Sequence, residues 1–157
     1  MEEAPQKDQP IDWIKVYQDS RYVFPFGDDQ YDVALNGEQP PLAKLDRSAT
    51  LITAWNPNSK ERPAEWNEVA NNRLRQSLSE AGYDFADAWG ASLPDVTPEW
   101  KESGFVVYGW TRAEAARWGR TWAQRAVVYL SADASELIFC EDEKVVPCGL
   151  RLFEARQ

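Results

Sequence analysis

The sequence contains no histidine among its 157 residues. That absence excludes Ser–His–Asp and Cys–His catalytic arrangements within the chain, and it excludes histidine as a general base. It also excludes the usual zinc sites that contain histidine, and two cysteines are too few for a four-cysteine site. An enzyme built on this chain would have to depend on carboxylates, Tyr, Lys, Arg or a bound metal.

Clustered positive charge and long apolar runs are also missing. The chain carries 17 Lys and Arg against 26 Asp and Glu, a net charge of −9, which disfavours general binding to nucleic-acid backbones. No apolar run reaches the roughly 18 residues of a membrane-spanning helix. The first ten residues, MEEAPQKDQP, are acidic and polar, unlike a signal peptide, and are predicted to form a flexible terminus. We therefore expect a cytoplasmic protein with no membrane association and no nucleic-acid partner.

The two cysteines, Cys140 and Cys148, flank a predicted turn centred near Lys144. In a hairpin with that turn the two thiols would lie opposite each other, which allows a disulfide. A reducing cytoplasm favours free thiols instead.

Apolar and aromatic residues are abundant. Hydrophobic residues make up 43% of the chain and include eight tryptophans, enough for a sizeable core, and the length fits one domain over residues 1–157. Residues 50–54 (TLITA) and 105–109 (FVVYG) are apolar runs without polar alternation, which predicts central strands covered on both faces.

The stretch from residue 49 to residue 78 predicts a buried strand, a polar loop and an amphipathic helix. Asn56-Pro57 breaks the strand, and Pro63 suits the first turn of the following helix. The predicted core-facing stripe of that helix contains Trp66, Val69, Ala70, Leu74, Leu78 and Ala81.

Asn67 interrupts this apolar stripe, and Asn71 lies one turn further on at its edge. A buried amide without partners costs about 1–3 kcal/mol, so Asn67 is expected to have specific partners. Two interpretations remain: Asn67 bonds to the backbone of the loop at residues 56–63, or it faces a ligand.

The remaining elements are weaker predictions. Residues 11–17 form either a helix or a short strand, and Gly27-Asp28 joins two strands in a hairpin that ends at Asn36-Gly37. Thr111 and Glu114 have the spacing of a capping box before a second helix, in which Trp118 and Trp122 face the core. Further strands are predicted at residues 83–89, 127–130, 137–140 and 150–153.

The element order predicts an α+β fold with a mainly antiparallel sheet. Two principal helices lie on one face of the sheet, over a split βαβ, ferredoxin-like core. The N-terminal hairpin and the C-terminal strands extend or cover this core.

Several side chains are candidates for chemistry, each with a structural alternative. Glu102, beside Ser103, either binds a ligand hydroxyl or amine and acts as a general base, or is a solvated residue at a strand end. Gln124 either recognises a ligand beside Asn56 or caps the second helix. The basic group of Arg112, Arg117, Arg120 and Arg125 either binds phosphate or forms a solvated helix face. Trp55 is the tryptophan expected to border a pocket.

Four motifs carry a resemblance to a known family. They are T-A-W-N-P-x-S at residues 53–59, N-x-x-x-N-x-x-L at residues 67–74, E-S before the apolar run at 105–108, and Q-x-A at residues 124–126. Over about residues 48–131 the chain resembles the bacterial family called domain of unknown function 3293. Ala70 departs from the pattern, where the family has an Arg, so a cation there is not essential in this chain. The resemblance implies a shared fold, leaves a shared pocket open, and implies no reaction.

Three functions remain open. The first is a domain that binds a small polar ligand or nucleotide in a pocket near the Asn56 loop. The second is an acidic protein-interaction or regulatory module, and the third is a hydrolase or transferase that uses Glu102 as its base. No metal site is predicted, and the sequence leaves the question of a cofactor open. The predicted ligand-binding residues are Trp55, Asn56, Ser59, Asn67, Asn71, Glu102, Ser103 and Gln124.

Asn56, Asn67 and Gln124 are predicted to converge in space. Tracing the strands and helices up and down in turn places Gln124 at the opposite edge of the sheet from Asn56. Convergence then requires a second helix that is short or bent, which Gly119 permits.

Overall fold

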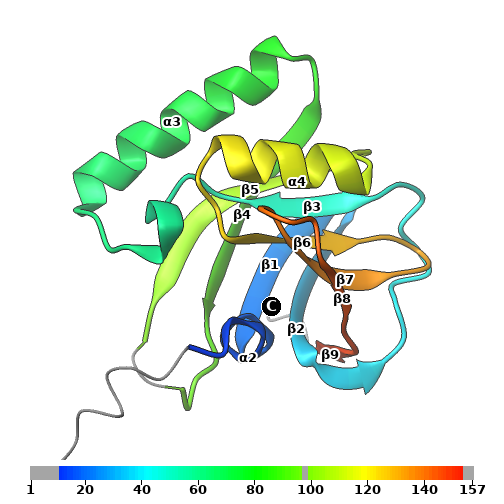
Figure 1. Ribbon diagram of the computed structural model, residues 1–157. Helices are drawn as coiled ribbons and strands as arrows, with labels where there is room; N and C mark the ends of the chain where they lie inside the picture. Colours follow the sequence, from blue (N-terminus) through cyan, green and yellow to red (C-terminus); the bar gives the residue numbers. More distant parts are fainter. Residues whose placement is uncertain (1–10, 97–98, 154–157) are drawn as a thin grey trace, which may run out of the picture.

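The two uninterrupted apolar runs form the middle of one sheet. The computed structural model describes residues 11–96 and 99–153, and within them nine strands form an antiparallel sheet in the order β8-β7-β6-β3-β5-β4-β1-β2-β9 (Figure 1). The predicted central strands are β3 (Ala49–Ile52) and β5 (Lys101–Tyr108), which pair directly with each other. The other strands are β1 (Ser20–Phe26), β2 (Asp29–Gln39), β4 (Asp84–Ser92), β6 (Ala126–Leu130), β7 (Ser135–Phe139), β8 (Val145–Pro147) and β9 (Leu150–Leu152).

The sheet is curled into a half-barrel and buries a separate core on each face. On β5, Val106 and Tyr108 face the inner core, whereas Phe105 and Val107 face the helices. The two outermost strands, β8 and β9, are consecutive in the chain and are separated only by Cys148 and Gly149. This short link between the two ends of the sheet agrees with its strong curl.

The three α-helices of the described residues divide between the two faces. The long helices α3 (Ala64–Glu80) and α4 (Arg112–Thr121) share one core on the outer face (Figure 1). The short helix α2 (Trp13–Gln18), which begins at the N-cap Asp12, packs Ile14 and Tyr17 against the inner core. This settles residues 11–17 as a helix rather than a strand.

The predicted core-facing stripe of α3 is partly wrong. Leu74 and Leu78 are buried as expected, but Trp66 is 42% exposed and Val69 is 51% exposed. The buried positions in the first half of the helix are Asn67 and Asn71 instead. The helix is rotated relative to the prediction because these amides form hydrogen bonds with the end of β3 and with the loop. Those hydrogen bonds outweigh the free energy that burial of Trp66 and Val69 would contribute.

The second helix matches its sequence signals. Thr111 and Glu114 form the predicted capping box, and Trp118 stacks on Trp110 with 5.4 Å between ring centroids. Gly119 packs so closely on β7 that a β-carbon there would lie 2.3 Å from the Cys140 sulfur. Cys140 and Cys148 are both free thiols, and burial raises the pKa of Cys140 to about 12.

The hairpin around Gly27 is confirmed, but Asn36-Gly37 does not end it. The second strand continues to Gln39, because β9 pairs with it beyond this point. A β-carbon on Gly37 would lie 2.1 Å from the carbonyl oxygen of Leu150, so the glycine allows this close approach rather than a turn.

The predicted α+β class, antiparallel sheet and two main helices are confirmed. A ferredoxin-like core is not established, because the strands form one continuous curled sheet of nine rather than a bounded four-stranded unit. The predicted flexible terminus, residues 1–10, lies outside the described residues. Within the described residues, no helix is long and apolar enough to cross a membrane.

Candidate functional site

Asn56 and Asn67 form a paired amide unit where β3 leads into α3. The Asn67 side chain accepts a hydrogen bond from the Asn56 backbone N–H at 2.9 Å and donates to the Asn56 side-chain oxygen at 2.9 Å. It also donates to the carbonyl of Arg62 at 3.2 Å. Asn67 is 1% exposed, so its amide is buried with both its donor and its acceptor used. Bonding to the loop backbone, one of the two interpretations of this residue, is therefore observed.

Asn71 holds the next turn of α3 against the sheet. Its oxygen accepts from the Ala54 backbone N–H at 2.8 Å, and its NH₂ donates to the carbonyl of Ser103 at 2.9 Å. Thr53 also donates to that carbonyl, at 2.6 Å. Ser103 thus takes part through its backbone, and Asn71 acts as a link between β3 and β5.

Glu102 lies on the inner face of β5 and meets the same network. The Asn56 NH₂ donates to Glu102 Oε2 at 3.2 Å. Burial raises the pKa of Glu102 to about 7, and the hydrogen bond from Asn56 opposes that rise only in part. The carboxyl therefore changes its protonation state near neutral pH, which suits a general acid or base.

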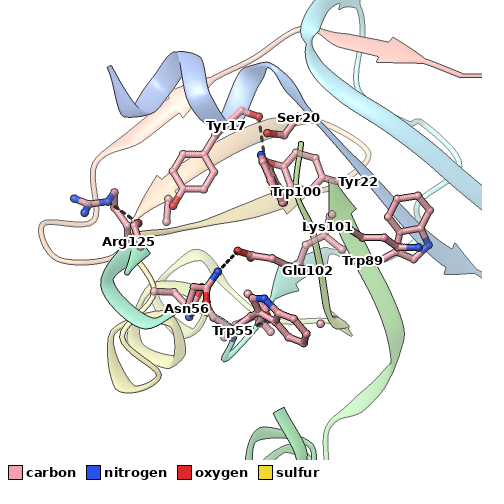
Figure 2. A pocket seen from close by; sticks show the side chains of 18 of the residues that line it. Tyr17, Ser20, Tyr22, Trp55, Asn56, Trp89, Trp100, Lys101, Glu102 and Arg125 are labelled. Carbon is pink, nitrogen blue, oxygen red and sulfur yellow. Dashed lines mark hydrogen bonds between the residues drawn. The ribbon is translucent and has the colours of Figure 1, made fainter. Parts of the chain in front are cut away.

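Asn56, Asn67 and Glu102 open onto a cavity of about 710 Å³ at one end of the half-barrel (Figure 2). In the view of Figure 2, Glu102 extends toward Asn56 between the indole rings of Trp55 and Trp100. The walls come from α2, β1, β3, β4, β5, β6, the loop before α3 with the first turn of that helix, and the turn after α4. They include Trp13, Tyr17, Ser20, Tyr22, Trp55, Asn56, Ser59, Arg62, Asn67, Trp89, Gly90, Trp100, Lys101, Glu102, Gln124 and Arg125.

Comparison with known proteins gives one family. Residues 52–127 match the family model described as protein of unknown function (DUF3293). That match defines residues 52–127, just under half of the 157 residues, as a DUF3293 domain. The resemblance seen in the T-A-W-N-P and N-x-x-x-N motifs is thereby confirmed. No curated protein and no solved structure matched the chain.

The structure brings most of the predicted site residues of the DUF3293 domain to the cavity. Trp55, Asn56, Ser59, Asn67, Glu102 and Gln124 line it, whereas Asn71 and Ser103 are absent from its walls. The last two positions hold the strands behind the cavity through the hydrogen bonds described above.

The position predicted for Gln124 from the order of elements is wrong. β5 starts at the Asn56 end of the sheet and runs away from it, so α4 runs back and delivers Gln124 to that same end. Its NH₂ donates to the carbonyls of Trp55 at 3.4 Å and Trp122 at 3.2 Å. No bend at Gly119 is needed. Gln124 both closes the end of α4 and attaches it to the Asn56 loop.

Sequence analysis missed much of the aromatic wall. Trp13, Tyr17 and Tyr22 lie outside the family match, and they reach the cavity because β1, with the helix α2 before it, pairs with β4. Val128 also lies outside the match and reaches the cavity because β6 pairs with β3. Tyr22, Gly90 and Glu102 occupy one row across three adjacent strands. Gly90 has no side chain in this row, and a β-carbon there would lie 3.3 Å from the ring of Tyr22, so the glycine allows the phenol ring to lie close against β4. A glycine within an otherwise regular strand was the available signal.

Two arginines of the basic group on α4 have partners among the described residues. Arg112 pairs with Glu136 at 2.7 Å, and Arg120 donates to the carbonyl of Cys140 at 2.6 Å. Arg125 instead faces the cavity, where it donates to Ser59 Oγ at 3.1 Å. No group of three or more Cys, Asp or Glu residues in the described part of the chain is placed to hold a metal.

Backbone strain is concentrated beside the cavity. Asn56, Asn58, Ser59 and Ala123 have φ values of 46°, 57°, 61° and 58°, in the left-handed region that non-glycine residues seldom adopt. The Asn58 N–H donates to the Ala123 carbonyl at 2.7 Å, so the strained segments support each other. Strain of this kind clusters at functional sites more often than elsewhere.

Replacing Ala123 with glycine tests whether this strain is real. An Ala123→Gly variant is expected to be more stable by about 0.5–1 kcal/mol, because glycine adopts a positive φ without steric cost. Urea unfolding monitored by tryptophan fluorescence measures the change. Ala81→Gly is the matched control: Ala81 is exposed with φ −77°, so glycine there should not stabilise the protein. Equal effects of the two substitutions would contradict the strain at Ala123.

Proposed function

We propose that this DUF3293 domain binds a small organic ligand in the cavity at the Asn56 end of the sheet. One observation carries the proposal. Six polar or aromatic residues singled out in the sequence, from Trp55 to Gln124, line one cavity of about 710 Å³. That volume lies within the range of about 300–1,000 Å³ typical of small-molecule sites.

The composition of the walls supports this proposal. Four of the eight tryptophans (Trp13, Trp55, Trp89 and Trp100) face the same cavity. The polar groups are few and are fixed in place, as in the Asn56–Asn67 pair and the Asn56–Glu102 hydrogen bond. Apolar walls with a few fixed polar groups are characteristic of sites that orient a bound molecule.

A catalytic role for Glu102 is the second candidate. Its pKa of about 7 is the observation in its favour, because a general base works best when its pKa is close to the working pH. A hydrolase or transferase would use the carboxylate to take a proton from water or a substrate hydroxyl. The acidic interaction module has no comparable feature in its support.

We also infer that the segment from β3 to β6 is a split βαβ unit within the larger sheet. The order β6-β3-β5-β4 and the placement of α3 and α4 on one face support this reading. It accounts for the meeting of the β3 end, the β5 start and the α4 end at the cavity.

A thermal-shift screen against amines, nucleotides, sugars and carboxylates tests ligand binding. A ligand at 100 times its dissociation constant stabilises the native state by about 2.7 kcal/mol, which raises the melting temperature by several degrees. Any hit should be lost in Trp55→Ala and kept in Trp66→Ala. Trp66 is the matched control, because it is exposed on α3 and does not line the cavity. Hits that survive Trp55→Ala, or a screen with no hits, would contradict the proposal.

A further inference from the structure

The Glu102 carboxyl has no cationic partner in the part of the chain that the structure describes. Within residues 11–96 and 99–153, its one hydrogen bond comes from the neutral amide of Asn56. Glu102 lines the cavity and lies in one row with Gly90 and Tyr22 across three adjacent strands. Among the described residues, no Lys or Arg forms an ion pair with it. A half-buried carboxylate therefore faces the cavity without a compensating charge.

The cations around the cavity are engaged elsewhere. Lys101 lies over the ring of Trp89 at 4.3 Å, and Arg125 lies over Trp13 at 3.9 Å while it donates to Ser59. Arg62 lies over Trp66, outside the cavity, at 5.0 Å. Each of these three cationic side chains packs over an indole ring. None of them neutralises Glu102, and an incoming anion would meet the Glu102 charge.

The geometry points to an organic cation as the ligand of this cavity, with an N–H group that donates to Glu102 and a flat or apolar body against Trp55 and Trp100. The inference rests on the proposed ligand-binding function. A charge brought out of water needs an opposite charge, and the ligand supplies the one that the described chain lacks. Indole and phenol faces attract cations, which adds to this preference. The net charge of −9 favours the approach of a cation from solution.

Binding of a cation should follow the ionisation of Glu102. The other titratable groups at the cavity come from every side of it: Tyr17 on α2, Tyr22 on β1, Glu61 and Arg62 before α3, Glu99 and Lys101 at β5, and Arg125 after α4. Burial raises the pKa of Tyr17 to about 12, and it also raises the pKa of Tyr22, so neither phenol titrates near neutral pH. Affinity should therefore rise by up to about tenfold per pH unit below about pH 7 and level off above it.

Benzamidine, benzamide and benzoate make a matched set of probes. They share a phenyl ring and a planar polar group, and they carry a positive charge, no charge and a negative charge. Quenching of tryptophan fluorescence and isothermal titration calorimetry give the affinities of the full chain. Benzamidine is expected to bind at least about tenfold more tightly than benzamide, with no binding of benzoate. Benzylamine and putrescine extend the set to N–H cations of other shapes.

The Glu102→Gln variant should lose at least about tenfold in affinity for the cations and show no pH dependence. Glu68→Gln, which replaces an exposed carboxyl on α3, should bind as the wild type does. Should Glu102→Gln fold poorly, the pH profile of the wild type alone decides the question. A flat profile, equal binding of benzamide, or no binding by any of the cations would overturn the inference. If a neutral or anionic compound from the screen binds in a Trp55-dependent way, ligand binding stands and only the cationic preference fails.

Discussion

An Asn67→Ala variant is expected to be about 3 kcal/mol less stable than the wild-type protein. The substitution removes three hydrogen bonds from a side chain that is 1% exposed, and it leaves the Asn56 N–H without its acceptor. A partly buried donor left unpaired costs about 1–3 kcal/mol, and the lost packing adds to that. Urea unfolding should show a midpoint lower by roughly 1–3 M, since m is about 1–3 kcal/mol/M.

Asn72→Ala provides the matched control for this experiment. Asn72 lies on the same helix but is exposed. Both substitutions gain about 0.5 kcal/mol of intrinsic helix propensity, so their difference isolates the lost hydrogen bonds. If the two variants unfold at the same urea concentration, the Asn56–Asn67 pair does not hold the loop in solution, and the cavity wall built on that loop is wrong.

Asn67 could be predicted from sequence because a polar residue within an apolar stripe has a physical cost. The sequence indicated that the amide needed partners and named the loop at residues 56–63 as one source of them. The same reasoning failed for Trp66 and Val69. Helical periodicity alone assigns apolar residues to the core, whereas here Asn67 and Asn71 take the buried positions because the loop and the β3 end need their amides.

The residues that meet at the cavity differ in whether their proximity could be predicted from the local sequence. Trp55, Asn56 and Asn67 lie within one strand–loop–helix segment, so their proximity follows from short-range geometry. To predict the position of Gln124, one must count how often the chain reverses direction between Asn56 and Gln124. That count was wrong by one element. Once the register of β5 against β3 is known, the return of α4 to the Asn56 end follows directly.

The cavity residues on α2 and β1 could not be predicted from the sequence for a different reason. Tyr17 and Tyr22 reach the cavity because β1 pairs with β4 on the far side of β5 from β3. That pairing joins segments about 70 residues apart, and no motif in either strand encodes it. The curl of the sheet depends on the register of all nine strands, so the cavity is a property of the assembled sheet.

The ionisation of Glu102 leads to a second prediction with a large expected effect. The folded-state pKa of this carboxyl is about 7, above its ordinary value of 4.5. The native protein therefore binds more protons than the unfolded chain between those values, and its stability falls as pH rises through this window. Below about pH 4 both states are protonated, and Glu102 contributes no penalty.

A Glu102→Gln variant should be more stable than the wild type by about 2–3 kcal/mol at about pH 8 and equal to it at about pH 4. Glutamine keeps an oxygen that accepts from Asn56 and carries no charge, so it removes the desolvation penalty without emptying the site. Thermal unfolding at a series of pH values measures the difference, which corresponds to roughly 5–10 °C at about pH 8 for a chain of this length. Glu68→Gln should shift the melting temperature little at any pH, because Glu68 is exposed. A Glu102→Gln variant with the wild-type pH profile would mean that water reaches the carboxyl freely. The same result would also remove the basis for a cation-selective cavity.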